Sequence, residues 1–469
     1  MLFPSPIFLF AFLPTFLVLY FCVKDKYKNF VLFICSIIFY AYGELIYVFL
    51  MLALLIYNFF MGILIENKCK KKKKYFIFTI SVNIIILIVF KYIGFFISVI
   101  NQCFTVDFEI IDIKLPLGIS FYTFQMISYI IDVYKNKIKA QHKFTYLGAY
   151  LAAFPQLIAG PIVRYKEIES QLSKKNISMD HFVQGFRRFT YGLGKKCFIA
   201  NILGRTVDSL ILEEVSNIGL LGVLIIGIAY TLQIYFDFSG YSDMAIGLGK
   251  ILGFNYPENF DYPYTAKTVT EFWRRWHMTL TRFFRDYIYI PLGGNRVGKF
   301  RHIFNILIVW CLTGFWHGAQ YTMIVWGLYF AVVLILEKFI IGKYISKLPI
   351  IRNIYTLSIV VISFVIFRSN NLGQAIELIQ ALFGKYGFLG ALDSIELIFT
   401  HNYVNGTFVI ALIAGIILSM PIFKVIEGKV ENGNRVLYSL RIVLVSVIFI
   451  FSIIYILSSS YNPFIYFKF

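Results

Sequence analysis

Long apolar runs alternate with short polar segments along most of the chain, a pattern typical of membrane-spanning helices. A helix needs about 20 apolar residues to cross the ~30 Å hydrocarbon core of a bilayer. Because several runs are shorter than this, we expect roughly ten to twelve membrane helices, some of them broken or re-entrant. The candidate segments are residues 6–23, 30–42, 45–65, 75–100, 119–134, 146–160, 219–236, 303–315, 321–339, 355–367, 406–422 and 442–457.

The composition supports this interpretation, since 59% of the 469 residues are hydrophobic and only 15% are charged. Soluble globular domains are usually about 45–50% apolar and about 25% charged. No long linker, soluble domain or short-period repeat interrupts the pattern. We therefore predict an all-α polytopic membrane protein with one domain, 1–469, made of N-terminal spans (1–115), a motif-bearing core (116–330) and C-terminal spans (331–469).

The distribution of the net charge of +19 predicts the orientation of the chain. Basic residues in short loops mark the cytoplasmic side, and their alternation here places the N-terminus outside. The lysine run could be a nucleic-acid patch, but its flanking spans favour a topology signal that contacts anionic lipids. The basic positions are Lys24, Lys26, Lys28, Lys68, Lys70–Lys74, Lys135, Lys137, Lys139 and Lys143, and the acidic ones after the fourth span are Asp107, Glu109 and Asp112.

The six cysteines show no CxxC spacing and mostly lie in apolar runs. This pattern predicts buried small hydrophobic side chains, not a disulfide framework or a metal site. The cysteines are Cys22, Cys35, Cys69, Cys103, Cys197 and Cys311.

Polar residues and helix breakers enter the membrane segments between residues 116 and 164. Residues 116–125 begin with a proline and a glycine and then carry Ser120, Tyr122, Thr123 and Gln125, and residues 154–161 contain two prolines. Each segment alone is compatible with a simple helix kink. Because non-helical backbone at membrane depth must be covered by protein or water, the two together suggest a packed core around a cavity.

Residues 235–243 end an apolar run with two carboxylates among aromatic side chains and a glycine. Asp237 could serve as a buried helix cap, and Asp243 could lie in a solvated turn. The alternative is a functional position for Asp237 and the neighbouring Tyr241. A metal site is a poor interpretation, because no His or Cys stands at ligand spacing nearby.

Two histidines stand in aromatic, glycine-marked contexts, and the first closes the sequence Trp273-Arg274-Arg275-Trp276-His277. If this segment is one helix that continues through Arg285 and Asp286, Trp273 and His277 share a face at i, i+4 spacing. A basic and aromatic helix of this kind could be an interfacial anchor. It could also form a cationic entrance for a phosphate-bearing donor such as a coenzyme A thioester.

The second histidine, His317, lies inside the apolar stretch of residues 303–341 and is flanked by Gly314 and Gly318. The fourteen residues from Ile303 to Trp316 would extend about 21 Å as a helix, which places the imidazole well inside the bilayer. The glycine spacing is compatible with a close helix contact and a structural histidine. The functional alternative is a general base that takes a proton from a hydroxyl group during acyl transfer.

These two histidine segments, about forty residues apart in a polytopic chain, resemble the signature of the membrane-bound O-acyltransferase (MBOAT) family. The resemblance covers essentially the whole chain and is most specific for the bacterial alginate O-acetyltransferase branch. The other matching segments are 116–125, 154–164, 236–249, 254–264, 285–296 with its Ile290-Pro-Leu-Gly-Gly-Asn-Arg296 sequence, and 462–469.

The resemblance implies a ring of helices around a thin centre, where a cytoplasmic opening and an outer funnel meet near His317. It implies that His317 is the essential histidine and that His277 is a second functional position that positions substrate. No bound cofactor is implied; acetyl-CoA or another acyl thioester would be the donor substrate. The remaining candidate substrate- or donor-binding residues are Trp273, Arg274, Asp237, Tyr241, Trp316, Arg285 and Asp286.

The family further implies that acetyl groups cross the bacterial cytoplasmic membrane to an extracytoplasmic polysaccharide. An extracytoplasmic acetyltransferase and a polysaccharide synthase would be partners, and nucleic acid would not be one. Two alternatives stay open. The teichoic-acid D-alanylation branch shares both histidines but generally lacks the Pro-Leu-Gly-Gly-Asn-Arg loop, and a non-catalytic transporter or scaffold could also bury polar groups.

Overall fold

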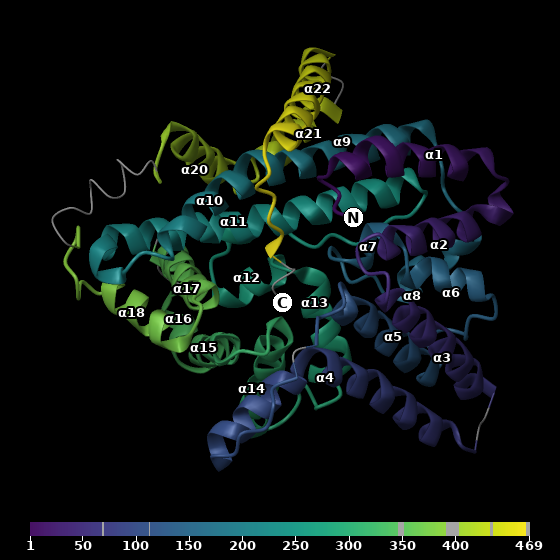
Figure 1. Cartoon of the computed structure of the whole chain (residues 1–469), viewed down its shortest axis with the longest axis horizontal. Coiled ribbons are helices and arrows are strands. Elements are labelled where there is room, and N and C mark those ends of the chain that lie inside the picture. Colours follow the sequence, from purple (N-terminus) through teal and green to yellow (C-terminus); the bar gives the residue numbers. More distant parts are fainter. Residues whose placement is uncertain (68–69, 112, 346–350, 391–402, 432–434, 466–469) are drawn as a thin grey trace. The chain divides into compact units, whose positions relative to one another are not determined.

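The computed structural model describes residues 1–67, 70–111, 113–345, 351–390, 403–431 and 435–465, and every regular element in them is helical. Lys68, Cys69, Asp112 and Phe469 lie outside these residues. The α-helices (Figure 1) are α1 Leu13–Cys22, α2 Asp25–Ala41, α3 Tyr47–Asn67, α4 Lys72–Phe104, α5 Ile119–Tyr134, α6 Phe144–Leu151, α7 Phe154–Leu157, α8 Tyr165–Ser173, α9 Met179–Lys195, α10 Asn201–Leu210, α11 Val215–Ile251, α12 Val269–Arg275, α13 Met278–Phe284, α14 Lys299–His317, α15 Tyr321–Leu336, α16 Gly342–Ile345, α17 Ile351–Arg368, α18 Leu372–Leu382, α20 Gly406–Leu418, α21 Ile422–Glu431 and α22 Arg435–Ser458.

Short π-helical and 3₁₀ turns extend or join several of these helices. The π-helical turns η1, η2, η4 and η5 continue directly into or out of α-helices, and η3 is a 3₁₀ turn that precedes α12. Their bounds are Phe8–Phe12, Lys196–Ala200, Arg285–Tyr289 and Glu337–Ile341 for the π-helical turns, and Pro263–Thr265 for η3.

The chain forms two compact units that interleave in sequence. Unit 1 contains Met1–Phe189 and Ser242–Glu258, and unit 2 contains Thr190–Tyr241 and Asn259–Phe469. Helices α9 and α11 contribute residues to both units. The division of one domain at residues 115 and 330 stays a prediction.

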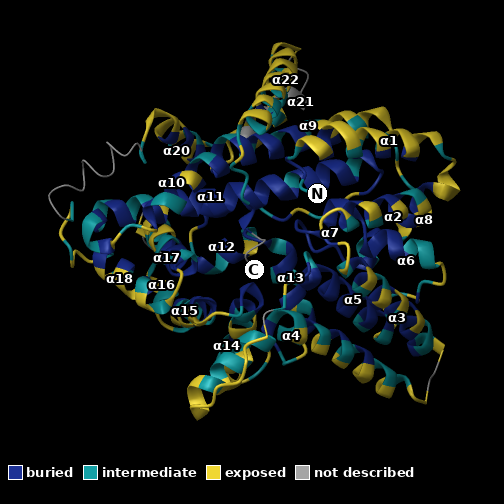
Figure 2. Cartoon of the chain, viewed as in Figure 1, coloured by how far each residue is buried: buried dark blue, intermediate teal, exposed yellow. Residues whose placement is uncertain are grey.

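Six helices of the described chain are long and apolar enough to cross a membrane, by length and composition. The ring-like arrangement, the total of ten to twelve membrane helices and the N-terminal orientation stay predictions. Figure 2 shows that α22, one of the six, is largely exposed. The six are Tyr47–Asn67, Lys72–Phe104, Val215–Ile251, Tyr321–Ile345, Ile351–Arg368 and Arg435–Ser458, and two shorter apolar helices are Phe8–Cys22 and Gly406–Leu418.

In unit 1 the predicted helix breaks occur where the sequence places its prolines and glycines. Residues 152–153 separate α6 from α7, so the apolar run 146–160 is not one span. Gly118 has a φ of +73° and starts α5, and a Cβ there would lie 2.4 Å from the carbonyl oxygen of Leu157. This close approach requires glycine. The polar side chains of α5, including Thr123 and Gln125, are buried.

In unit 2 helices α14 and α15 pack closely against each other. A Cβ at Gly314 would lie 2.3 Å from the carbonyl oxygen of Met323 and 3.1 Å from the Cα atom of Gly327, so the two backbones approach without intervening side chains. The close helix contact suggested by the glycine spacing is therefore present. It fixes the end of α14, where His317 is the last helical residue.

Two expectations about the membrane segments are wrong. The run that includes Asp237 does not end there, because α11 continues to Ile251, so Asp237 is an interior helical residue and not a helix cap. Three cysteines predicted to be buried, Cys22, Cys103 and Cys311, are exposed on helix surfaces, whereas Cys35 and Cys197 are buried. Their apolar neighbours indicated a membrane segment, but they did not indicate which face of the helix is covered.

Candidate active site

His317 lies at the C-terminal end of α14, just before α15 begins at Tyr321, and its side chain is only 5% exposed. Three aromatic rings surround the imidazole. Its ring centroid lies 4.8 Å from that of Trp316, 5.0 Å from that of Trp326 and 5.3 Å from that of Phe367, all in edge-to-face geometry. The sequence predicted Trp316 as a site residue, and the structure adds Trp326 and Phe367.

A second layer of aromatic rings supports this enclosure. Trp273 on α12 packs edge-to-face against Trp326, with ring centroids 5.7 Å apart, and against Trp310 at 4.6 Å. Phe330 contacts Trp273 at 4.9 Å and Trp326 at 5.2 Å. Aromatic pairs of this geometry are each worth about 0.5–1.5 kcal/mol beyond burial. Trp273 therefore packs behind Trp326, one of the rings that contact His317.

His277 does not continue the helix that carries Trp273, so the expected shared face is wrong. Helix α12 ends at Arg275, and His277 adopts a left-handed backbone conformation with φ 41° and ψ 53° before α13 begins. A non-glycine residue in this region stores strain, and such residues concentrate at functional sites. The break turns the imidazole inward, where it is 1% exposed.

Asn259 fixes the orientation of the His277 ring. Its Oδ1 atom lies 3.0 Å from Nδ1 of His277 and accepts a hydrogen bond from the Thr279 hydroxyl at 2.8 Å. Because an amide oxygen only accepts, Nδ1 of His277 carries the proton and donates a hydrogen bond to Oδ1 of Asn259. The Nε2 atom is then the basic nitrogen of this ring.

The two histidines belong to one aromatic cluster. The Trp316 ring centroid lies 6.0 Å from that of His277 and 4.8 Å from that of His317, so one indole contacts both imidazoles. Phe238 on α11 packs edge-to-face on His277 at 4.7 Å. His277 lies outside the candidate membrane spans. Burial lowers its pKa below the ordinary value, and the neighbouring His317 lowers that pKa further, so the ring is neutral at pH 7.

Glu337, a buried carboxylate on η5, holds the start of α12. It accepts hydrogen bonds from the backbone N–H groups of Val269 and Thr270 at 2.7 and 3.0 Å, and from the Thr270 hydroxyl at 2.6 Å. A carboxylate is favourable there because the first N–H groups of a helix lack intrahelical partners and carry partial positive charge. Glu337 thus anchors the helix that presents Trp273.

Asp237 and Tyr241 on α11 lie together against the C-terminal segment. Oδ1 of Asp237 lies 2.6 Å from the ammonium group of Lys196, and its Oδ2 accepts the backbone N–H of Ile465 at 2.9 Å. Tyr241 packs on Phe464 with ring centroids 4.8 Å apart. These contacts give Asp237 a structural partner, and its role in substrate binding stays a prediction.

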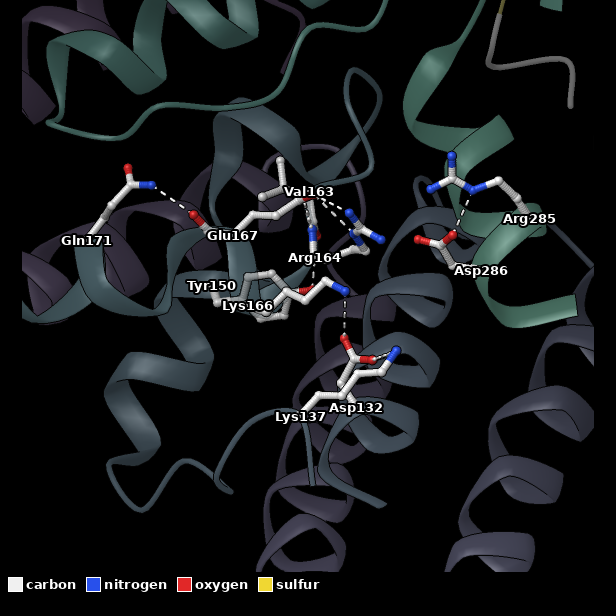
Figure 3. Close-up of polar contacts among 10 residues, drawn as sticks. All are labelled: Asp132, Lys137, Tyr150, Val163, Arg164, Lys166, Glu167, Gln171, Arg285 and Asp286. Carbon is white, nitrogen blue, oxygen red and sulfur yellow. Dashed lines mark hydrogen bonds and ion pairs between the residues drawn. The ribbon is translucent and has the colours of Figure 1, made fainter. Parts of the chain in front are cut away.

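The remaining sequence candidates lie nearer the surface of unit 2. Nε of Arg285 donates to Oδ1 of Asp286 at 2.8 Å (Figure 3). The Arg285 side chain is 58% exposed. Arg274 is exposed on α12, whereas Arg275 pairs with Glu271 at 2.7 Å. Arg275 is thus bound to a carboxylate of its own helix, whereas Arg274 and Arg285 are exposed.

Unit 1 has its own ion pairs, each with one buried and one partly exposed partner. Arg164 donates from Nε and Nη2 to Glu167 at 3.1 and 2.6 Å, and its backbone N–H also donates to that carboxylate (Figure 3). Asp132 is 1% exposed and lies 3.7 Å from the ammonium groups of both Lys137 and Lys166.

Comparison with known proteins decides the family. A family model described as "MBOAT, membrane-bound O-acyltransferase family" matches residues 137–368, a range that contains both histidines. The chain is 40% identical to a probable alginate O-acetylase of Pseudomonas aeruginosa over 396 aligned residues. These residues cover 82% of this chain and 75% of that protein. The chain belongs to the membrane-bound O-acyltransferase family.

Two other members of the family show how far the similarity extends. A peptidoglycan O-acetyltransferase of Helicobacter pylori is 32% identical over 522 residues, which cover 100% of this chain and 98% of that protein. A teichoic acid D-alanyltransferase of Bacillus subtilis is 30% identical over only 240 residues, 48% of this chain and 59% of that protein. This MBOAT protein is a membrane enzyme of the O-acyltransferase class, with a probable alginate O-acetylase and a peptidoglycan O-acetyltransferase among its relatives.

Sequence reasoning missed several residues that shape the MBOAT site. Asn259 lies within a segment that matched the family, but no local pattern connected it to His277. Glu337 stands as a lone carboxylate near the end of an apolar run, which is a recognisable signal. Lys196 gave no signal, because its partner Asp237 is 41 residues away along the chain.

Proposed function

We propose that this protein is an O-acetyltransferase that takes acetyl groups from a cytoplasmic thioester, acetyl-CoA, and delivers them across the membrane for O-acetylation of an extracytoplasmic polysaccharide. The names of two relatives support acetyl transfer, since those proteins are a probable alginate O-acetylase and a peptidoglycan O-acetyltransferase. The D-alanyltransferase match covers about half of the chain and supports the alternative donor less strongly.

In this proposal His317 is the general base. The observation that supports it best is a buried imidazole at the end of α14, enclosed by Trp316, Trp326 and Phe367 and joined to a second imidazole through Trp316. Neutral imidazole removes the proton of the acceptor hydroxyl as its oxygen attacks the acetyl carbonyl carbon. The C–S bond then breaks, and the imidazolium returns the proton to the leaving thiolate.

His277 acts in this scheme as the assistant on the donor side. Its neutral ring, held by Asn259, presents Nε2 as an acceptor within the same aromatic cluster. Arg274 and the Arg285–Asp286 pair are the groups that would bind the donor's phosphates, because guanidinium groups match phosphate oxygens in geometry and charge. Trp273, Asp237 and Tyr241 would shape the passage to the thioester.

The cellular setting follows from the same chemistry. The protein would reside in a bacterial cytoplasmic membrane with its N-terminus outside and its basic loops in the cytoplasm, where acetyl-CoA is made. An extracytoplasmic acetyltransferase and a polysaccharide synthase would be its partners. This arrangement supplies the donor on one side of the membrane and the acceptor on the other.

A donor-competition experiment tests the proposal. The purified protein in liposomes is supplied with radiolabelled acetyl-CoA or with a D-alanyl-loaded carrier protein, and label transfer to a soluble oligosaccharide is measured. We expect transfer from acetyl-CoA that His317→Ala abolishes and that His142→Ala, a change at an exposed histidine of unit 1, leaves intact. Transfer only from the loaded carrier would support D-alanylation, and uptake of solute without acyl transfer would support a transporter.

A further inference from the structure

Beside His317 the structure buries two hydrogen-bond donors that no group of the described chain accepts. The side chains of Thr322 and Trp326 are each 1% exposed. Within the described residues neither Oγ1 of Thr322 nor Nε1 of Trp326 has a hydrogen-bond partner. Because an unpaired buried polar group costs about 1–3 kcal/mol, two such groups in one place indicate that a ligand atom completes the site.

Both donors lie on one face of α15, and Trp326 on that face contacts His317. Residues four apart on a helix are neighbours on one face, and Thr322 and Trp326 have this spacing. The Trp326 ring is edge-to-face with the His317 ring, with centroids 5.0 Å apart. Thr322 lies one turn nearer the start of α15, towards the short connection that follows His317.

The beginning of α15 adds a favourable electrostatic environment. The helix starts at Tyr321, its N-cap residue Gln320 makes no side-chain capping bond, and Thr322 lies in the first turn. The exposed N–H groups of a first turn carry partial positive charge, which favours a negatively charged oxygen close by. The buried Thr322 hydroxyl, independently of the helix end, indicates where that oxygen binds.

We propose that Thr322 and Trp326 donate hydrogen bonds to the oxygen of the reacting acyl carbonyl, a role that rests on the acetyl-transfer function proposed above. When the acceptor hydroxyl gives its proton to His317 and bonds to the carbonyl carbon, the C=O π electrons move onto this oxygen. The hydroxyl and indole donors stabilise the resulting oxyanion. As the C=O bond re-forms, the C–S bond breaks and the thiolate takes the proton from the imidazolium.

The chemistry of the two side chains suits this ligand. A thioester carbonyl is uncharged before attack and anionic afterwards, and neutral donors in a dry site bind the second state more strongly than the first. If the Thr322 hydroxyl only filled space, Thr322→Val would have little effect on catalysis, because valine replaces the hydroxyl with a methyl group of similar size. Removal of one oxyanion donor typically lowers kcat by about 10²–10³.

The test uses Thr322→Val, Thr322→Ser and Trp326→Phe in the liposome acetyl-transfer assay, with Thr407→Val, at an exposed position of α20, as the matched control. We expect Thr322→Val to lower kcat by about 10²–10³ with the KM for acetyl-CoA within about threefold of wild type, and Thr322→Ser to restore most of the rate. Trp326→Phe should lower kcat as well. The Thr322→Val protein should unfold at the same or a higher temperature, since it loses an unpaired buried hydroxyl.

Two results would overturn the inference while the wild-type enzyme is active. One is a Thr322→Val enzyme with wild-type kcat, and the other is an equal loss of rate and thermal stability in Thr322→Val and Thr322→Ser. A wild-type protein that transfers no acetyl group from acetyl-CoA would instead refute the proposed function, and the inference would fall with it. The wild-type rate therefore distinguishes the two failures.

Discussion

Oδ1 of Asn259 lies 3.0 Å from Nδ1 of His277 and accepts a hydrogen bond from the N–H of that nitrogen. The pair sets both the orientation of the imidazole and the identity of its basic nitrogen. The backbone of His277 is in the strained left-handed region, and the bond to Asn259 holds its ring in one orientation. Asn259 is thus a positioning residue for the second histidine of the site.

We expect Asn259→Ala to lower acetyl transfer by roughly 5- to 100-fold, because a buried N–H left without an acceptor costs about 1–3 kcal/mol. The assay is initial-rate transfer from acetyl-CoA in liposomes. Asn101→Ala removes a partly exposed amide of unit 1, also hydrogen-bonded to backbone, and serves as the control. A full wild-type rate for Asn259→Ala would show that the orientation of His277 does not matter for turnover.

The lowered pKa of His277 predicts a pH dependence of stability. Because the folded protein disfavours the imidazolium, the unfolded chain binds the proton more readily. The stabilising contribution is fully present above the unfolded pKa of about 6.5 and is lost as the pH falls below that value. Relative to His277→Asn, the wild-type free energy of unfolding should fall by up to about 1.4 kcal/mol per pH unit between about pH 6 and pH 5. Unfolding in mixed micelles measures this difference, and parallel pH curves for the two proteins would contradict it.

Gly314 is predicted to be intolerant of even one methyl group. Its Cβ would lie 2.3 Å from the Met323 carbonyl oxygen, so Gly314→Ala must separate α14 from α15 and move His317 relative to Trp326. We expect a lower melting temperature and a loss of transfer. At Gly298, where a Cβ would contact no atom within 4 Å, the same substitution should change neither. Equal behaviour of the two variants would show that the helix contact is not required.

The buried pair of Lys196 and Asp237 should be more important as a pair than as separate charges. Removing one partner of such a pair typically costs about 3–5 kcal/mol, because it leaves the other charge buried and uncompensated. Lys196→Met should therefore destabilise the protein strongly, and the double variant Lys196→Met/Asp237→Asn should recover much of the loss. Thermal unfolding and transfer rate are measured together. If Asp237→Asn alone lowers the rate without changing stability, Asp237 has a substrate role and not a structural one.

The sequence predicted the helical class and the family because both depend on features that repeat or lie close together along the chain. The long apolar runs, the proline at the start of α7 and the two histidine motifs are all of this kind. The local geometry of His277 could not be predicted in this way, since α12 ends inside a segment with good helical spacing. Tertiary contacts of its neighbours determine that break.

The hydrogen-bond partners of the site residues could not be predicted from the local sequence either. Asn259 is 18 residues from His277 along the chain. Glu337, which accepts a hydrogen bond from the Thr270 hydroxyl, is 67 residues from Thr270. No periodicity connects such positions. Trp326 was visible only as one of several aromatic residues in an apolar helix, and its contact with His317 depends on the close packing of α14 on α15.

The most direct measurement of the central proposal is the acetyl-transfer rate of His317 variants that are inserted in the membrane at wild-type levels. His317→Ala and His317→Gln should each lower transfer by at least about 10², the usual contribution of a general base, and acetylated glycan should disappear from cells that carry them. His142→Ala should retain both the rate and the glycan. Wild-type transfer by a correctly inserted His317→Ala protein would contradict the assignment of His317 as the catalytic base.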